Sequence, residues 1–313
     1  MGIDSPSPQS PAAALARPAM RLGVLVGLFL FVILAWGLNW VAMKIVVREI
    51  PPIWAVAIRT WIAVGVLVPA LALSGQFRVP SLKDLPVIGV ISLLHMVAFA
   101  TLMTAGLKYL PAGRAVVLGY TTPLWVAPAA WMLLNERPSP MQLGGIVLGL
   151  AGLGLLFDPL AFDWRDRGQV LGNALILGAA LCWSISIVYT RFHTWIATPF
   201  QLILWQTLLA ATVLTVLAAI AEGAVAMSLS PNAVAALTYN GAIGTALGYW
   251  AMTVVNKELP ATVTSLGLLG TPVGGLALSA TILGESAEIR LLVSSALILT
   301  GIALGLISLP RRP

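Results

Sequence analysis

The chain has 313 residues, of which 59% are hydrophobic and only 9% are charged, and its net charge is +6. A soluble globular domain carries about 25% charged residues, because charge covers the surface that faces water. The composition therefore excludes a soluble enzyme, a nucleic-acid-binding protein and a disordered protein. The basic residues are scattered and form no Lys/Arg-rich run of the kind that binds nucleic acid. We predict an all-α integral membrane protein surrounded by the lipid bilayer.

Residues 1–21 are rich in Pro, Ser and Ala, which predicts a disordered tail. The apolar run that follows has no cleavage site and is too long for a signal peptide, which indicates an uncleaved first helix. A spanning helix needs roughly 20 mostly apolar residues. The chain contains ten such stretches, at residues 22–47, 53–74, 86–107, 111–134, 140–157, 169–190, 198–221, 233–256, 260–284 and 288–309.

The connections between these stretches are short, so no separate soluble domain is expected. Basic residues on the two predicted sides nearly balance, and the positive-inside rule favours cytoplasmic N- and C-termini only slightly. We expect a multi-pass protein of the bacterial cytoplasmic (inner) membrane. The lone Cys182 excludes an internal disulfide.

The two halves of the sequence resemble each other. Ala35-Trp36 recurs 147 residues later as Cys182-Trp183. Further elements recur at a spacing of 149 residues: Leu110-Pro111-Ala112 as Leu259-Pro260-Ala261, Thr122-Pro123 as Thr271-Pro272, and Glu136 as Glu285. We predict a first repeat at 22–157, a linker at 158–168, a second repeat at 169–309 and a tail at 310–313. Because each repeat holds five helices, an odd number, the repeats must be inverted, as in secondary transporters.

Pro123 and Pro272 fall at equivalent places, near the middle of the fourth predicted helix of each repeat. A proline removes a backbone hydrogen bond and kinks a helix, so the pair could form hinges between the repeats. The alternative is an ordinary membrane-helix proline, which is common.

The segment from Ala35 to Lys44, followed by Pro51-Pro52 and Ile58-Arg59, resembles the opening signature of the EamA family of the drug/metabolite transporter superfamily. The stretch from Gly106 to Leu156 resembles the close of an EamA repeat. The resemblance covers residues 22 to 309 and implies a transporter of amino acids, metabolites or drugs. Within the family, the chain is most similar to the YddG-type aromatic amino acid exporters.

The second repeat departs from this signature. Ser184 and Ser186 stand where the first repeat has Gly37 and Asn39, and Gln206 stands at the position of Arg59. Arg59 is a candidate to bind a substrate carboxylate through its bidentate fork, but a structural role is favoured. In a structural role it would extend to the membrane interface or pair with Glu49.

The acidic residues all fall in the tail, in loops or at helix ends. Proton-driven carriers usually place an ionisable group within a span. The sequence therefore favours a facilitator or exchanger over a proton-coupled pump. Glu136 and Glu285 each precede the next helix, where a carboxylate meets the positive end of the helix dipole.

Aromatic and weakly polar residues deep in the spans are the candidates for substrate binding. Trp36 and Asn39 share a helix face, as do Trp183 and Ser186. Deep aromatic residues usually pack against lipid or other helices, and a buried His often only bonds a neighbouring helix. The predicted substrate-binding set is Trp36, Asn39, Trp40, His95, Phe99, Tyr120, Trp183, Ser186 and Tyr249.

An amphipathic path of this kind suits a zwitterion with an apolar side chain. The leading hypothesis is a secondary transporter that exports amino acids, aromatic or hydrophobic ones, and related small metabolites by alternating access. The alternative is an exporter of drugs or cationic metabolites, which would prefer an acid within the membrane. An enzyme is disfavoured because no HExxH pair or mid-membrane aspartate pair exists. We expect no cofactor and no metal, and GxxxG spacings predict a monomer or a weak homodimer.

Overall fold

The computed structural model describes residues 20–106, 108–110, 118–157, 165–224, 229–275 and 289–307. These residues form helices and connections without a strand, which confirms the all-α prediction. The elements are α1 (Leu22–Val46), α2 (Pro52–Leu73), η2 (Leu82–Asp84), α3 (Leu85–Val90), η3 (Ile91–Ala98), α4 (Phe99–Gly106), α6 (Thr122–Leu134), α7 (Pro140–Phe157), α8 (Arg167–Phe192), α9 (Pro199–Glu222), α10 (Pro231–Tyr239), η5 (Asn240–Leu247), α11 (Gly248–Glu258), α12 (Ala261–Gly267) and α14 (Ile289–Ile307).

Every predicted apolar stretch carries helix. Among the described residues, 5 helical segments are long and apolar enough by themselves to cross a membrane: Leu22–Met43, Pro52–Leu73, Leu82–Gly106, Arg167–Phe192 and Pro199–Glu222. The total of ten crossings stays a prediction.

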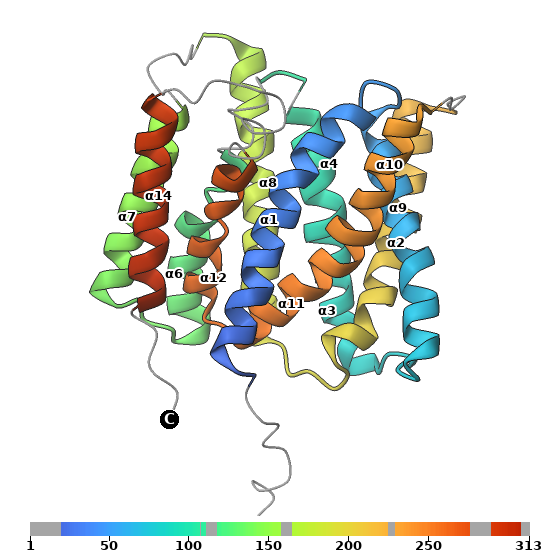
Figure 1. The fold of residues 1–313 in the computed structure, drawn as a ribbon, viewed down its shortest axis with the longest axis horizontal. Coiled ribbons are helices and arrows are strands. Elements are labelled where there is room, and N and C mark those ends of the chain that lie inside the picture. The colour runs from blue at the N-terminus through green and yellow to red at the C-terminus, as the bar shows by residue number, and fades with distance from the viewer. Residues whose placement is uncertain are drawn as a thin grey trace, which may run out of the picture.

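The helices form an elongated bundle in which α7 and α14 lie side by side at one end (Figure 1). Helices α2, α9 and α10 lie at the other end, and α1 and α8 run between these two groups. In this view α1 begins at the lower edge of the bundle, whereas its repeat equivalent α8 begins at the upper edge. This opposite direction is what an inverted repeat requires.

The repeat is also visible in a local irregularity of the backbone. Segments η3 and η5 are π-helical turns, and both their first and their last residues are 149 residues apart, which is the spacing of the sequence repeat. Each forms the middle of a longer helix, between α3 and α4 and between α10 and α11. A π-helical turn is rare and is often found at functional sites, because it widens the helix and redirects side chains.

The fourth helix of each repeat is broken. In the first repeat the chain leaves helical geometry at Tyr120 and Thr121 and re-enters it in α6. In the second, α12 ends at Gly267, and helix resumes at Gly270. Broken helices at equivalent places are typical of the midplane of secondary transporters.

These breaks correct the expected positions of the two prolines. Pro123 lies in the first turn of α6, and Pro272 lies in the first turn of the helix that resumes at Gly270, so neither is mid-helix. A proline is favourable in a first turn, because its missing N–H would have no intrahelical partner there. Both side chains are buried.

Small residues let the fifth helices of the two repeats approach closely. A Cβ atom at Gly145 of α7 would lie 2.5 Å from the carbonyl oxygen of Gly301 of α14. A Cβ atom at Gly301 would in turn lie 3.0 Å from the amide nitrogen of Gly149. The GxxxG spacings of α7 and α14 therefore serve contacts within the chain.

Candidate functional site

The structure brings six of the predicted site residues into one aromatic cluster. The cluster consists of Trp36, His95, Phe99, Tyr120, Trp183 and Tyr249. The rings of His95 and Trp183 stack with centroids 5.1 Å apart and planes inclined by 18°. Tyr249 lies 4.7 Å from His95, and Phe99 lies 5.0 Å from Trp183. The rings thus fill the space between α1, η3, α8 and α11 by contact with one another.

Trp36 and Trp183 are repeat equivalents, and their rings are 5.8 Å apart. The residues around them differ between the repeats. On the side of η3 and α4, His95 and Phe99 contact Trp183. On the side of η5 and α11, the equivalent positions hold Gly244 and Gly248.

These two glycines make room for α1. A Cβ atom at Gly248 would lie 2.7 Å from Nε1 of Trp36, and one at Gly244 would lie 2.5 Å from Oδ1 of Asn39. Trp36 donates its indole N–H to the carbonyl oxygen of Gly244 at 2.9 Å, which fixes the ring orientation. The two repeats therefore contribute unequally to the cluster, with rings at His95 and Phe99 where the other repeat has glycines.

Polar atoms without a partner lie around this cluster. Oδ1 of Asn39, Nε of Arg59 and Nε1 of Trp183 are buried and have no hydrogen bond within the structure. Arg59 is placed near the cluster by its backbone, because its carbonyl oxygen lies against Gly241 on η5, one turn before Gly244, which accepts the indole N–H of Trp36. Buried polar groups in proteins are nearly always hydrogen-bonded, so each of these atoms requires an explanation.

The remaining predicted site residues are placed less closely. Ser186 is buried on α8, one turn after Trp183. The backbone of Trp40 belongs to α1, and its side chain lies outside the described part of the chain. Glu49, one of the alternatives considered as a partner of Arg59, accepts hydrogen bonds from Ser230 instead.

Sequence reasoning missed Gln206 as a candidate in its own right. It is fully buried, and neither of its side-chain amide atoms has a partner. The backbone carbonyl oxygen of Gln206 accepts a hydrogen bond from the hydroxyl of Ser92 on η3 at 2.9 Å. Its repeat equivalent, Arg59, likewise presents its carbonyl oxygen to Gly241 on η5, where a Cβ atom would lie 2.7 Å away. The repeat alignment was the signal that could have identified Gln206.

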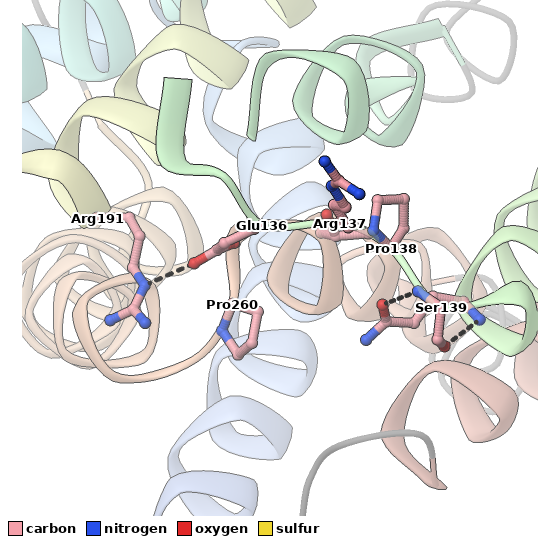
Figure 2. Close-up of a pocket in the computed structure, with 8 residues that line it drawn as sticks. Glu136, Arg137, Pro138, Ser139, Arg191 and Pro260 are labelled. Carbon is pink, nitrogen blue, oxygen red and sulfur yellow. Dashed lines mark hydrogen bonds and ion pairs between the residues drawn. The ribbon is translucent and has the colours of Figure 1, made fainter. Parts of the chain in front are cut away.

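Glu136 joins the two repeats through hydrogen bonds at helix ends. Glu136 accepts a hydrogen bond from Nε of Arg191 at 3.0 Å, and another from the amide of Ala261 at 3.0 Å. Arg191 also donates to the carbonyl oxygen of Lys257 at 2.7 Å. Glu136 and Arg191 border a cavity of about 320 Å³, whose lining also includes Arg137, Pro138, Ser139, Gln142, Pro260 and Thr262 (Figure 2).

This geometry corrects the expected role of Glu136. The carboxylate lies at the N-terminus of α12 in the other repeat, and not at that of α7, which follows it in sequence. The N-terminal cap of α7 is instead formed by Ser139, whose hydroxyl accepts the amide N–H of Gln142. The repeat equivalent Glu285 lies outside the described residues.

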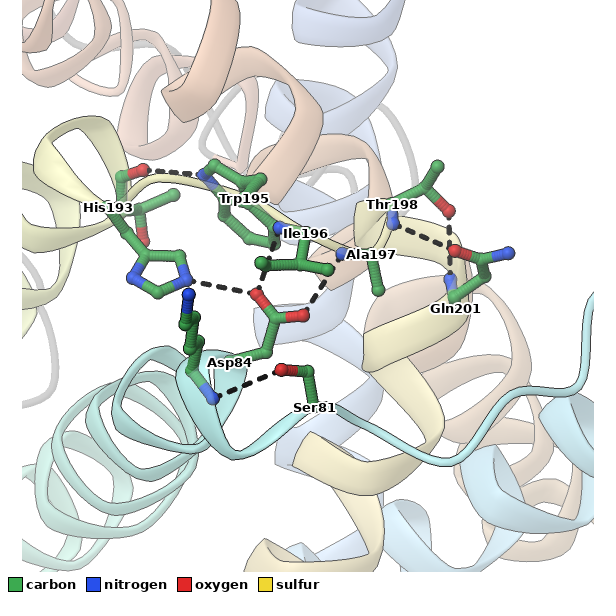
Figure 3. Close-up of polar contacts among 10 residues, drawn as sticks. Ser81, Asp84, His193, Trp195, Ile196, Ala197, Thr198 and Gln201 are labelled. Atoms are coloured by element: carbon green, nitrogen blue, oxygen red, sulfur yellow. Dashed lines mark hydrogen bonds and ion pairs between the residues drawn. The ribbon is translucent and has the colours of Figure 1, made fainter.

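Asp84 forms a second contact between the repeats (Figure 3). Its carboxylate is fully buried and accepts hydrogen bonds from Nε2 of His193 at 3.1 Å and from the amides of Ile196 and Ala197 at 3.2 and 3.0 Å. His193 is itself nearly buried, since only 9% of its side chain is exposed. Asp84 holds the connection between α8 and α9 against the start of α3.

Two further carboxylates, Glu49 and Glu222, also join the repeats. Glu49 accepts both the amide and the hydroxyl of Ser230, the cap of α10, at 2.7 and 2.6 Å. These hydrogen bonds, first the hydroxyl and then the amide, hold the pKa of Glu49 below its usual value. Glu222 accepts the amides of Ile53 and Trp54 at the start of α2, both at 3.0 Å. All four carboxylates therefore join one repeat to the other at helix ends.

A helical membrane protein built from two inverted repeats, with broken helices and unpaired polar groups at their junction, has the architecture of a secondary transporter. The chain belongs to the EamA-like transporter family, whose model matches residues 22–158 and 170–307. It is thus a multi-pass membrane transporter, and the predicted family is confirmed. The narrower similarity to YddG-type exporters stays a prediction.

The chain matches two transporter relatives over nearly the full length of both proteins. The chain is 27% identical over 281 residues to a protein named "Uncharacterized transporter YoaV" of Bacillus subtilis, covering 90% of this chain and 96% of the relative. It is 26% identical over 298 residues to a "Probable amino-acid metabolite efflux pump" of Escherichia coli, covering 91% and 95%. A solved crystal structure shares the fold with a TM-score of 0.77 at 20% identity, covering 91% of this chain and 97% of that chain.

Proposed function

We propose that this protein exports amino acids, aromatic or hydrophobic ones, and related small metabolites, as a transporter and not as an enzyme. The observation that carries the proposal is the aromatic cluster with its unpaired polar atoms, at the junction of the two repeats. The rings provide an apolar surface for the side chain of an amino acid, and the unpaired polar atoms can bind its ammonium and carboxylate groups. The relative named as an amino-acid metabolite efflux pump supports this substrate class.

We further propose that transport proceeds by alternating access without proton coupling. The four carboxylates Glu49, Asp84, Glu136 and Glu222 are all engaged at helix ends, where they tie the repeats together. Among the described residues, the aromatic cluster contains no carboxylate that could carry a proton. The breaks before Pro123 and Pro272 would let each half-helix move separately, which fits a facilitator or exchanger.

The proposal includes the predicted organisation of the chain. We expect repeats at 22–157 and 169–309, cytoplasmic termini in the bacterial inner membrane, and a monomer or weak homodimer. Cysteine-accessibility labelling of the two termini in intact cells and in inverted vesicles would test the orientation.

The central experiment is efflux from proteoliposomes loaded with a panel of labelled amino acids. Trp183→Ala and His95→Ala should lower transport about tenfold, because each removes ring contacts worth about 1.5 kcal/mol. The matched control is Trp131→Ala, since Trp131 lies on α6 with 54% of its surface exposed. Thermal unfolding of each purified variant separates loss of folding from loss of transport.

Full transport of every substrate by both cluster variants would refute the site assignment. Absence of efflux of any amino acid by the wild-type protein, with efflux of cationic drugs instead, would refute the substrate class. Uphill transport driven by a pH gradient, with the membrane potential clamped, would refute the uncoupled mechanism.

A further inference from the structure

We propose that Arg59 binds the carboxylate of the transported molecule, so that the aromatic cluster accepts carboxylate-bearing solutes and discriminates against their neutral counterparts. This inference rests on the proposed function and adds to it a residue that determines specificity. It is carried by the position of Arg59, by its lack of a partner and by its difference from Gln206.

Arg59 lies well inside the membrane-spanning part of α2. It is the eighth residue of a helix of 22 residues, about 10 Å from the helix start at a rise of about 1.5 Å per residue. Burying a guanidinium in an apolar region is costly, and such a group normally has a partner that offsets the cost. An intramembrane arginine is therefore expected to serve a function.

The described structure gives the Arg59 side chain no such partner. Its Nε atom is buried without a hydrogen bond. The acidic residues that could neutralise it are used elsewhere, because Glu49 binds Ser230 and Glu222 binds the first amides of α2. Arg59 thus retains donor capacity for a ligand that carries an acceptor.

The surroundings of Arg59 point to the same ligand. The backbone carbonyl oxygen of Arg59 lies against Gly241 on η5, and Gly244, one turn later, accepts the indole N–H of Trp36 in the aromatic cluster. A guanidinium presents two parallel N–H donors that match the two oxygens of a carboxylate. The unpaired Oδ1 of Asn39 adds an acceptor for an ammonium group, and Nε1 of Trp183 adds another donor.

The repeat equivalent of Arg59 is the uncharged Gln206, so the two repeats differ in charge at this position. It occupies the eighth position of α9, as Arg59 does in α2, and both present their backbone carbonyl to the π-helical segment of the other repeat. A structural need shared by the repeats would favour the same residue at both positions. The cation is present in only one repeat, so an anionic group is attracted to the side of α2.

The experiment compares phenylalanine with phenylalaninamide, which replaces the carboxylate by a neutral amide of the same shape. Efflux of both is measured from proteoliposomes containing the wild-type protein, Arg59→Gln, Arg59→Lys and Arg48→Gln. The last is the matched control, because Arg48 is exposed beyond the end of α1. Phenylalanine binding to the detergent-solubilised proteins, followed by their tryptophan fluorescence, gives a second readout.

The wild-type protein should prefer phenylalanine, with its carboxylate, over phenylalaninamide, which keeps the amino group but has a neutral amide in place of the carboxylate, by about tenfold to a hundredfold, the range expected for a buried hydrogen bond to a charged group. Arg59→Gln should remove this preference, Arg59→Lys should keep part of it, and Arg48→Gln should leave it unchanged. Equal handling of both compounds by the wild-type protein, or an unchanged preference in a folded Arg59→Gln variant, would overturn the inference and leave the proposed export function standing. If the wild-type protein transports no amino acid, both fail. Should Arg59→Gln not fold, the wild-type comparison and Arg59→Lys still decide.

Discussion

Adjacent glycines on α7 allow a sharp test of how the repeats pack. Gly144 and Gly145 are neighbours in the same helix, yet their surroundings differ. A Cβ atom at Gly145 would lie 2.5 Å from the carbonyl oxygen of Gly301, whereas one at Gly144 would meet nothing within 4 Å. The backbone oxygen cannot move without displacing α14, so alanine should be tolerated at only one of the two positions.

The magnitudes follow from two opposing terms. Alanine in place of glycine inside a helix stabilises by about 1 kcal/mol, because glycine loses more backbone entropy on folding. Overpacking at a close contact costs about 1–3 kcal/mol. Gly144→Ala should therefore stabilise by up to about 1 kcal/mol, whereas Gly145→Ala should lie between neutral and about 2 kcal/mol destabilising.

The assay is thermal unfolding of both variants in the same detergent, followed by tryptophan fluorescence. Gly145→Ala should unfold several degrees below Gly144→Ala, since each kcal/mol shifts the midpoint by about 2 °C in a chain of this size. Equal midpoints would show that α7 and α14 do not approach each other as closely as the structure has them. Gly145→Leu should enlarge the difference, which guards against relaxation around a single methyl group.

Three further predictions concern the carboxylates at the helix ends. Glu136→Ala should lower the free energy of unfolding by about 1–3 kcal/mol, because it removes a charge-assisted hydrogen bond to Ala261 and a partly exposed ion pair. Its unfolding midpoint should fall below that of Glu136→Gln, which keeps one hydrogen-bond acceptor. Asp84→Ala should lower the free energy of unfolding by at least about 2 kcal/mol and speed amide hydrogen exchange in residues 193–197, because the His193 ring and two backbone amides lose their hydrogen-bond acceptor. Unchanged exchange would contradict this role of Asp84. Since Ser230 lowers the folded-state pKa of Glu49, the stability from this contact should be present above the usual carboxyl pKa and be lost as the pH falls through the folded-state value. Ser230→Ala should weaken the fall of the unfolding midpoint as the pH drops below the usual carboxyl value of 4.5, and an unaltered pH profile would show that the bond contributes nothing.

Much of the fold could be predicted because membrane helices follow from composition and length. The apolar stretches, the duplication and the family all depend on residues near one another in sequence or on a constant spacing. Six of the nine predicted site residues meet in the aromatic cluster, because deep aromatic residues in equivalent helices have few other places to pack. The break before Pro123 was missed, because a proline inside an apolar run is compatible with a kink as well as with a new helix start.

The contacts between helices were not predictable in the same way. Glu136 precedes α7 in sequence, yet it lies at the N-terminus of α12, because the fold brings that helix end closer. His193 is a polar residue at a helix end, and only the position of Asp84 buries it. Such partners are more than a hundred residues apart, and no local pattern links them.

By itself the sequence determined that this protein lies in a membrane, consists of two related halves and belongs among the EamA transporters. Hydrophobicity and repeat spacing are properties of the chain, and they hold whatever the helices touch. Only the tertiary structure decided which faces of the helices meet. Gly244 and Gly248 leave room for α1, His95 lies on a π-helical turn, and Nε of Arg59 is buried without a partner. These contacts depend on how side chains pack against one another, and the residues that pack together are far apart in the chain.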